Sequence, residues 1–395
     1  MDYSVDMNIA ILTSGRLPVP AVLGGAVENL IDYYLEYNDV HRMHHITVYS
    51  IKSDKIVSPD TAYNHYHYVD VKSAMAKMGR KIYAMLNKEA YYDSEIEYFL
   101  HRSLKHLKKQ HYDCVILENR PGYAMAVKRV TNVKLILHLH NDMLNKEAYR
   151  ATEIVSCLSK VITVSNFIKG RVQAIGGNVA TETVYNGIDL DRFQDKGHNT
   201  AVTREALGLD KDDFVVVYSG RLTREKGIKE LLEAFLLLKD HAVIKLLVIG
   251  GSFYGNDKAV QSPFMAELRQ TADKIQGRIV FTGFIDYENV PDYLRLADVA
   301  VVPSVWEEPF ALTCAEAMAA GLPLIATRVG GIPEVCGDAA ILIDTDNRFA
   351  ASLAQAITKL FDNALERKDL SSRGTSISNR FGKEHYAKDF MSSIA

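Results

Sequence analysis

Residues 299–327 read VAVVPSVWEEPFALTCAEAMAAGLPLIAT and contain one complete strand–helix–strand unit. The apolar residues Val299–Val302 are predicted to form a buried strand, which Pro303 follows. A helical pattern occupies Leu312–Ala320, and a Gly-Leu-Pro turn separates it from a second apolar run at Leu324–Ala326. Because a helix between two short buried strands joins parallel neighbours, this stretch predicts an α/β fold with helices covering a parallel sheet.

The same alternation continues along the rest of the chain. Further buried strands are predicted at Asn8–Leu12, Ile46–Tyr49, Cys114–Leu117, Lys134–Leu139, Val161–Val164, Phe214–Tyr218, Val243–Ile249, Arg278–Phe281 and Ala340–Ile343. Helices are predicted at Val27–Tyr37, Glu95–Lys109, Glu147–Leu158, Gly227–Lys239, Pro263–Ile275, Pro291–Leu296 and Ala350–Phe361. Two consecutive sets predict two doubly wound, Rossmann-like domains, and a ligand site is expected in a cleft where the carboxyl ends of their strands face each other.

The division between the domains is expected near the turn signal Asn186-Gly187 and the polar, unpatterned stretch that follows it. We predict an N-terminal domain at residues 1–195, a C-terminal domain at residues 196–375 and a final amphipathic helix within residues 376–395. The candidate packing contacts of that helix are Phe381, Tyr386, Phe390 and Met391.

The composition excludes several classes of protein. The chain has 395 residues, of which 48% are hydrophobic and 24% charged, so extensive disorder is excluded. A net charge of -3 argues against nucleic acid as the main partner. The four cysteines are scattered, which indicates a reducing compartment, and the apolar runs are too short to span a membrane. We therefore expect a cytoplasmic protein.

Two stretches of the second half carry candidate chemistry. Residues 219–227, SGRLTREKG, follow a strand and open a helix, so Arg221 and Lys226 are placed to bind phosphate, although a solvated charged loop is the alternative. In the second stretch, Glu308 precedes Pro309 and Glu316 falls about one turn into the next helix. Both carboxylates suit sugar hydroxyls, and the backbone N–H groups of Ala311, Leu312 and Thr313 suit an anion; a capped helix with two exposed acids is the alternative.

The first half offers weaker signals. Gly24-Gly25 precedes a helix and permits a close backbone approach to a ligand, as a plain turn also would. His138 and His140 share one face of a strand end near Asp142, but no further ligand has a recognisable metal spacing, so we predict no metal site. The match of residues 189–191 to a D-x-D metal motif lies in the interdomain linker and is interpreted as chance.

Taken together, and in this order, these stretches resemble the family 4 glycosyltransferases, the large retaining group with the GT-B fold. The resemblance rests on LGGAVENL (23–30), HLHND (138–142), VITVSNFIKG (161–170), VYNGIDLDRF (184–193), YSGRLTREKGI (218–228), FTGFIDYENVPDYLRLADVAVVPS (281–304) and EEPFALTCAEAMAAGLPLIATRVGGIPEV (307–335). The match is densest from Ser219 to Val335. It implies transfer of a sugar from a nucleotide diphosphate donor, with no metal and no cofactor. It also implies that the C-terminal helix crosses back to the first domain.

The resemblance assigns roles residue by residue. It places Arg221 and Lys226 at the donor diphosphate, Glu308 at the donor sugar and Glu316 at the nucleotide ribose. Counting favours Glu308 over Glu307, because the family pattern has seven residues between its two glutamates. Further implied positions are Gly25 at the donor phosphate, His140 near the transferred sugar and Ile285 at the base. Ala311 departs from the family, which usually has glycine there.

The implied mechanism is front-face attack, in which the departing phosphate receives the acceptor's proton. The implied acceptor is a saccharide or a lipid-linked saccharide, in cell-surface polysaccharide or glycoconjugate biosynthesis. The alternatives are a nucleotide-sugar epimerase and an inactive nucleotide-sugar-binding protein. The sequence does not identify the base, the sugar, the acceptor or the oligomeric state.

Residues 73–88 form a basic amphipathic pattern. Its apolar members Met75, Met78, Ile82, Met85 and Leu86 recur at helical spacing among the cations Lys77, Arg80, Lys81 and Lys88. We expect this helix to pack on its own domain with the apolar residues in the core. Weak contact with the inner face of a membrane is the alternative.

Overall fold

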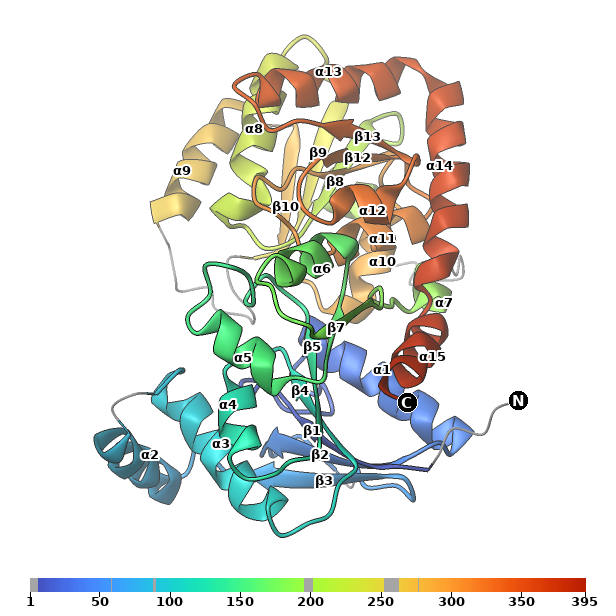
Figure 1. The fold of residues 1–395 in the computed structure, drawn as a ribbon. Coiled ribbons are helices and arrows are strands. Elements are labelled where there is room, and N and C mark those ends of the chain that lie inside the picture. The colour runs from blue at the N-terminus through green and yellow to red at the C-terminus, as the bar shows by residue number, and fades with distance from the viewer. Residues whose placement is uncertain (1–5, 58, 88–89, 195–201, 252–262, 276) are drawn as a thin grey trace. The chain divides into compact units, whose positions relative to one another are not determined.

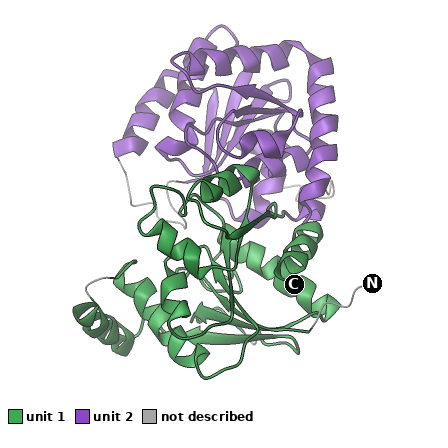
Figure 2. Ribbon diagram, viewed as in Figure 1, with its two compact units in different colours: residues 1–187, 383–395 green, residues 188–382 purple. Residues whose placement is uncertain are grey.

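The structure is a computed structural model that describes residues 6–57, 59–87, 90–194, 202–251, 263–275 and 277–395. It divides into two compact units: unit 1 comprises Met1–Gly187 and Lys383–Ala395, and unit 2 comprises Ile188–Gly382 (Figures 1 and 2). The boundary predicted between residues 195 and 196 lies outside the described residues, and the one between residues 375 and 376 stays a prediction.

The described part of unit 1 contains a seven-stranded sheet in which every pair of neighbours is parallel, in the order β3-β2-β1-β4-β5-β6-β7. Its strands are β1 (Asn8–Leu12), β2 (His45–Ile51), β3 (Asn64–Val69), β4 (Cys114–Glu118), β5 (Lys134–Leu139), β6 (Lys160–Thr163) and β7 (Ala180–Thr183). Its helices are α1 (Ala26–His41), α2 (Ala74–Leu86), α3 (Ser94–Leu107), α4 (Tyr123–Lys128), α5 (Ala151–Cys157), α6 (Asn166–Gln173) and α15 (Lys383–Ile394). Strand topology and helical covering are those of a Rossmann-like domain.

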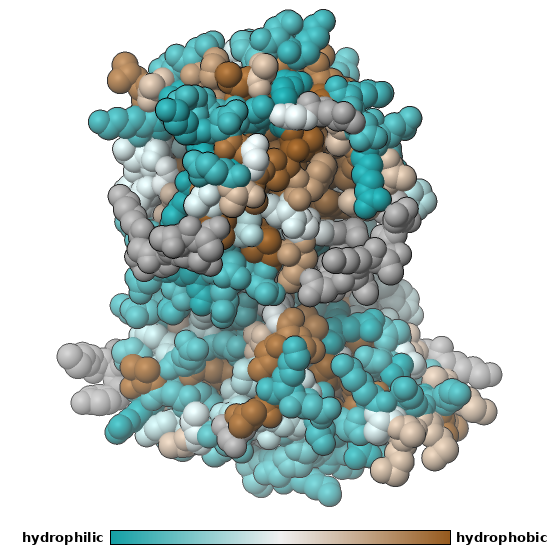
Figure 3. Space-filling model, turned by 180° about the vertical axis from the view of Figure 1, so that it is seen from behind, coloured by the Kyte–Doolittle hydropathy of each residue, from teal (hydrophilic) through white to brown (hydrophobic). Residues whose placement is uncertain are grey.

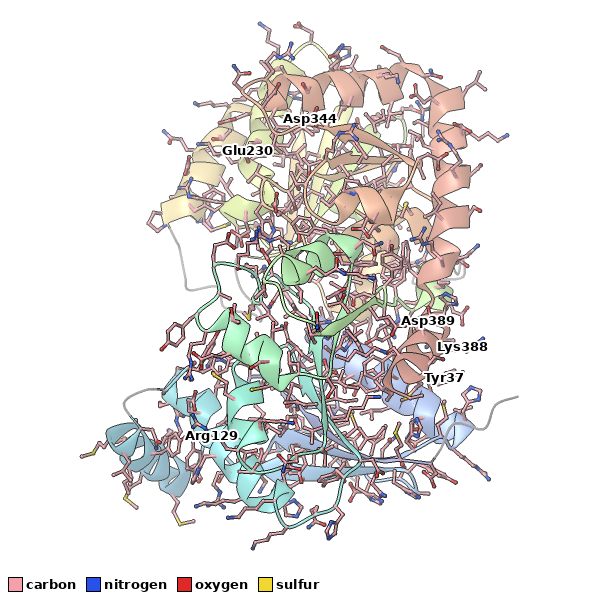
Figure 4. All side chains as sticks on the ribbon, viewed as in Figure 1. Tyr37, Arg129, Glu230, Asp344, Lys388 and Asp389 are labelled. Carbon is pink, nitrogen blue, oxygen red and sulfur yellow. The ribbon has the colours of Figure 1, made fainter. Side chains whose placement is uncertain are left out.

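The C-terminal helix α15 packs on α1, as the sequence predicts. The ring of Phe390 stacks on Tyr34 of α1 with the centroids 4.1 Å apart, and Tyr386 and Met391 are buried as well. Figure 4 shows Tyr37 of α1 beside Lys388 and Asp389 of α15. Gly187 permits this packing, because a Cβ at that position would lie 2.7 Å from the Cβ of Tyr386.

The described part of unit 2 contains a six-stranded parallel sheet in the order β10-β9-β8-β11-β12-β13. Its strands are β8 (Phe214–Ser219), β9 (Ile244–Ile249), β10 (Ile279–Gly283), β11 (Val299–Val302), β12 (Leu324–Thr327) and β13 (Ala340–Ile343). Its α-helices are α7 (Leu190–Gln194), α8 (Ile228–Leu237), α9 (Pro263–Ala272), α10 (Val290–Leu294), α11 (Leu312–Ala319), α12 (Ile332–Cys336), α13 (Phe349–Asp362) and α14 (Ala364–Ser378). The predicted strand–helix–strand unit at residues 299–327 is confirmed as β11, α11 and β12.

The short 3₁₀ turns of unit 2 are η1 (Glu205–Leu207), η2 (Arg224–Lys226), η3 (Asp273–Ile275), η4 (Tyr287–Asn289) and η5 (Asn379–Phe381). Residues 189–191, the D-x-D match, stand at the start of α7, where Asp189 Oδ1 accepts a hydrogen bond from the backbone N–H of Arg192 at 3.4 Å. A capping role therefore accounts for this aspartate.

Two strands at the edges of the unit 1 sheet were not predicted. β3 alternates polar and aromatic residues, and β7 contains no large apolar residue. An edge strand is covered on fewer sides than a central strand, so it does not need the continuous apolar run that indicates a buried strand.

The expectation that the apolar residues of 73–88 lie in the core is wrong. α2 forms and packs on α3, but Met75, Met78, Ile82, Met85 and Leu86 are all exposed. The face that packs is formed instead by Ala76, Gly79 and Tyr83, whose small or aromatic side chains allow close contact with α3. Lys88 lies outside the described residues. No helix in the described ranges is both long and apolar enough to cross a membrane.

Candidate functional site

In unit 2, the loop after β8 and the loop after β11 meet at Gly227. This glycine has φ 69°, and a Cβ there would lie 1.7 Å from the carbonyl oxygen of Pro303. Only glycine allows this approach without a shift of the backbone. The contact fixes Lys226, at the end of η2, beside the segment that carries Glu308.

Lys226 and Glu308 form an ion pair at this meeting point. The Nζ of Lys226 lies 2.5 Å from Glu308 Oε1, and Ser304 Oγ donates a hydrogen bond to the same oxygen at 2.6 Å. The Glu308 side chain is buried, whereas that of Lys226 is 23% exposed. Trp306 lies over the ammonium group, with its ring centroid 5.9 Å from Nζ. Lys226 can therefore reach an incoming anion while it stays close to Glu308.

Arg221 lies in the same loop and is more open to solvent. Its guanidinium lies 3.9 Å from the carboxylate of Glu225, a loose pair, and its side chain is 45% exposed. The backbone around it is well fixed, because the buried Tyr218 donates its hydroxyl hydrogen to the carbonyl of Arg221 at 2.7 Å. The loop thus presents an exposed cation on a backbone that a buried tyrosine holds.

The loop between β11 and α11 turns at Ala311, which adopts the left-handed conformation with φ 70° and ψ 73°. Residues other than glycine, asparagine and aspartate are strained in this conformation. This strain explains why the family that the sequence resembles usually has glycine at this position. Leu312 and Thr313 follow as the first two residues of α11, so their backbone N–H groups belong to the unpaired donors of a helix start. The N-terminus of α11 is thereby suited to an anion.

The Gly330-Gly331 turn after β12 packs directly on the backbone of Glu308. The N–H of Gly331 donates to the carbonyl of Glu308 at 2.7 Å, and a Cβ on Gly330 would lie 2.2 Å from that carbonyl oxygen. Three loops therefore converge on Glu308, and two of them need glycine for steric reasons.

Glu316 lies on the second turn of α11 and is buried. Its Oε1 accepts a hydrogen bond from the hydroxyl of Tyr287 at 2.9 Å, and burial raises the pKa of its carboxyl to about 7 despite that bond. Glu316, Thr313 and Ser219 line a small hollow above β8 and β11. Ile285 is half-buried in the short segment between β10 and η4.

Cys314 of α11 is not a nucleophile. Cys314 and Cys336 are free and fully buried, and the hydrogen bond between them, together with burial, raises the pKa of Cys314 well above its ordinary value. A thiol that stays protonated does not attack a substrate.

In unit 1, Glu118 at the end of β4 holds both histidines of the neighbouring strand end. Its Oε1 lies 3.2 Å from His138 Nδ1 and 3.0 Å from the hydroxyl of Tyr34, and its Oε2 lies 2.9 Å from His140 Nε2. Burial alone would raise the pKa of Glu118, but His138 and His140 outweigh it and hold the pKa at about 2. Sequence analysis missed Glu118, because a single acid at the end of an apolar run carries no motif.

The protonation state and the tautomer of His140 follow from its burial and from this contact with Glu118. Burial lowers its pKa and the neighbouring His138 adds to the effect, so the ring is neutral at pH 7. Because an ionised Glu118 accepts the Nε2 hydrogen, Nδ1 is left without hydrogen and acts as an acceptor. That atom is buried and has no partner among the described residues. Phe390 of α15 packs against His138, with the centroids of the two rings 4.8 Å apart.

Gly25 lies at the N-cap of α1 with φ 118°, and a Cβ there would lie 2.3 Å from a carboxylate oxygen of Glu28. Glu28 is buried, accepts a hydrogen bond from Ser14 Oγ at 3.2 Å, and has its pKa raised by burial. The glycine is therefore required by its own unit, whatever ligand it meets.

The three side chains Glu118, His138 and His140 have ligand atoms within 4.8 Å of one another, so they have the donor types of a metal site. Each of them is held by the hydrogen bonds just described. Asp142, which the sequence places beside the histidines, pairs instead with Arg171 at 2.8 Å.

Comparisons with known proteins identify the family to which the sequence belongs. The sequence profile of the group 1 glycosyl transferases matches residues 199–376, and that of Glycosyltransferase Family 4 matches residues 58–192. The chain is 30% identical to the putative glycosyltransferase YtcC of Bacillus subtilis, over 97% of this chain and 90% of that protein. It is 29% identical to the lipopolysaccharide 1,2-N-acetylglucosaminetransferase of Salmonella typhimurium, over 56% of this chain and 55% of that protein.

Solved structures show the same fold. HepE of Anabaena in complex with UDP-glucose superposes with a TM-score of 0.73 at 20% identity, over 98% of this chain and 99% of that one. The fold is thus GT-B, as predicted from the resemblance. With family profiles on both units and a relative at 30% identity over almost its whole length, the chain belongs to glycosyltransferase family 4, the retaining, metal-independent group 1 enzymes that use nucleotide sugars.

Proposed function

We propose that the chain transfers a sugar from a nucleoside diphosphate sugar to a saccharide or a lipid-linked saccharide, with retention of the anomeric configuration. The observation that carries the proposal is the Lys226–Glu308 pair, at 2.5 Å, beside the N-terminus of α11. A cation, a buried carboxylate and unpaired helix amides are what a donor made of a sugar and a diphosphate requires.

The diphosphate is the leaving group and gains negative charge as the glycosidic bond breaks. We assign its stabilisation to Arg221, Lys226 and the backbone N–H groups of Ala311, Leu312 and Thr313. Positive groups that are fixed before the reaction stabilise developing charge without reorganisation. In this account the two side chains supply the charge that a divalent metal supplies in other transferases.

Glu308 is assigned to hold the donor sugar and is not the nucleophile. Its carboxylate is already bound through Oε1 by Lys226 and Ser304, which fixes its direction. The other oxygen is the acceptor we assign to the sugar hydroxyls. The family resemblance supports front-face attack, in which the leaving phosphate removes the proton from the acceptor hydroxyl. Glu316 is assigned to the ribose hydroxyls and the backbone of Ile285 to the base.

In unit 1, Gly25 is assigned to the donor phosphate and His140 to the transferred sugar. The unprotonated Nδ1 of a neutral His140 accepts a hydrogen bond from a sugar hydroxyl. Glu118 keeps that ring in the required tautomer and is a positioning residue in this account.

The proposed acceptor belongs to the cell surface. The Salmonella relative named above acts on lipopolysaccharide, which supports a role in cell-surface polysaccharide synthesis. All four cysteines are free, which fits a reducing, cytoplasmic compartment.

The test is a panel of UDP-, GDP- and ADP-sugars incubated with the enzyme in excess EDTA, with slow donor hydrolysis followed by ion-exchange chromatography and the sugar anomer by NMR. We expect hydrolysis of one donor class, with the sugar released first as the donor's anomer. Loss of activity in EDTA that added metal restores would contradict metal independence. Epimerised donor without transfer would instead support the epimerase alternative.

A further inference from the structure

α2 carries an apolar stripe that faces solvent. Met75, Met78, Ile82, Met85 and Leu86 are between 53% and 79% exposed. At 100° per residue they fall on one side of the helix. Figure 1 places α2 at the outer edge of unit 1 beside α3, and Figure 3 shows light brown side chains gathered at that edge. A continuous stripe of exposed apolar side chains is typical of a surface that binds another protein or a membrane.

The face of α2 that adjoins the stripe packs on α3 and anchors the helix, so the stripe has a fixed direction. Gly79 lies against the ring of Tyr98, with a Cβ there 3.0 Å from it, and Tyr83 lies over His101 with the centroids 4.8 Å apart. Arg80 Nη1 pairs with Glu95 Oε2 at 2.6 Å. All three partners belong to α3. The helix therefore does not have to detach in order to present its stripe.

The charged residues of α2 itself have one sign. Lys77 and Lys81 are exposed on the flank of the stripe, Lys72 precedes the helix, and α2 itself contains no aspartate or glutamate. Asp70, the acid that precedes the helix, is engaged in capping, since its side chain accepts from the N–H groups of Lys72 and Ser73, and Glu89 follows the helix beside Lys88 in the sequence. Lysines beside exposed methionines match an anionic lipid surface, where the ammonium groups meet phosphates and the thioether chains enter the acyl boundary.

We propose that α2 is a docking surface for an anionic lipid bilayer. Lys77 and Lys81 supply electrostatic attraction, and the stripe supplies shallow insertion. Binding of lipid stands on the geometry of α2 alone; delivery of unit 1 to a lipid-linked acceptor rests additionally on the proposed function. Neither lysine belongs to the residues assigned to the donor, so binding and catalysis can be separated.

The experiment is co-sedimentation of the full chain with vesicles of phosphatidylglycerol and phosphatidylcholine, and with phosphatidylcholine alone, at low and high salt. We expect binding only to the anionic vesicles, weakened by salt. Because each cation near the surface is worth about a fivefold change in affinity, Lys77→Glu with Lys81→Glu should weaken binding at least twentyfold. Met75→Ser with Met78→Ser and Met85→Ser should also weaken it.

The matched control is Lys211→Glu with Lys368→Glu, which reverses two exposed lysines of unit 2 and should bind like the wild type. All variants are checked by thermal melting and by nucleotide binding. No binding at low salt, equal loss in the control, or a dimer that the methionine variant abolishes would overturn the proposal. Lipid binding without nucleotide binding would leave the lipid surface standing and contradict the proposed function instead.

Discussion

Glu308 in unit 2 and Glu118 in unit 1 are both buried carboxylates near the carboxyl end of a parallel sheet, but their partners differ. Glu308 is bound by a cation, Lys226, that is 23% exposed, whereas Glu118 is bound by Tyr34, His138 and His140, which are fully or almost fully buried. The first arrangement leaves a charge that can turn to an incoming phosphate. The second arrangement has no exposed charge that could turn to a ligand, and it fixes the ring of His140 in place. In the proposed function, unit 2 supplies the charge for the reaction and unit 1 supplies geometry.

The largest expected effect follows from removing the cations of unit 2. Arg221→Ala and Lys226→Ala should each lower turnover about a hundredfold, because each removes a group that stabilises the leaving diphosphate. Steady-state donor hydrolysis measures this. Lys229→Ala is the control, since Lys229 lies on α8 and pairs with Glu267 at 2.9 Å on the surface. Wild-type rates in both Arg221→Ala and Lys226→Ala would remove the basis of the assignment.

Removing the charge of Glu118 should lower the stability of the fold. Glu118→Gln places an amide N–H₂ against groups that already donate, so the free energy of unfolding should fall by about 2 kcal/mol. Urea denaturation measures the loss. Glu153→Gln, at an exposed carboxylate that pairs with Arg150, should leave the free energy of unfolding almost unchanged. Similar losses in the two variants would show that burial of Glu118 does not matter.

The contrast between the two carboxylates also explains what sequence could predict. The loops of unit 2 contain glycines, a proline and charged residues directly after apolar strands, so they stand out from the sequence, and Lys226 and Glu308 were both identified. Their direct contact, 82 residues apart, depends on the approach of Gly227 to Pro303 and required the structure. Glu118 and His138 are neighbours only through the register of β4 and β5, which no local pattern reports.

The helix α2 shows a different limit of sequence analysis. Its periodicity correctly predicted the helix, but periodicity alone does not state which face packs. The five apolar residues looked like core, while the packed face contains Ala76, Gly79 and Tyr83. The edge strands β3 and β7 were missed for the related reason that their surroundings are partly polar.

A smaller effect is expected at the turn before α11. Ala311→Gly should raise the free energy of unfolding by about 1 kcal/mol, because glycine adopts φ 70° without strain. Ala317→Gly, inside α11, is the matched control and should lower it by about 1 kcal/mol. Both are measured by thermal and urea unfolding. If the two substitutions destabilise equally, the backbone at Ala311 is not strained.

The smallest effect concerns pH. Burial raises the pKa of Glu316 to about 7 from an ordinary value of 4.5, so the carboxyl is mostly protonated at pH 6 and mostly ionised at pH 8. An ionised carboxylate accepts two hydroxyl hydrogen bonds, so nucleotide affinity should rise about threefold over this interval. Glu316→Gln should lack this part of the pH dependence while it keeps the part due to the phosphate. A pH profile identical to that of the wild type would exclude Glu316 from the ribose site.

Calorimetric titration of UDP, GDP and ADP in excess EDTA tests the central claim most directly, with the wild type, Lys226→Ala and Lys229→Ala measured side by side. We predict that one of the three nucleotides binds the wild type without metal. We also predict that Lys226→Ala weakens this binding by at least about tenfold and that Lys229→Ala leaves it unchanged. Equal binding by the three proteins, or binding that appears only when a divalent metal is added, would contradict the central claim.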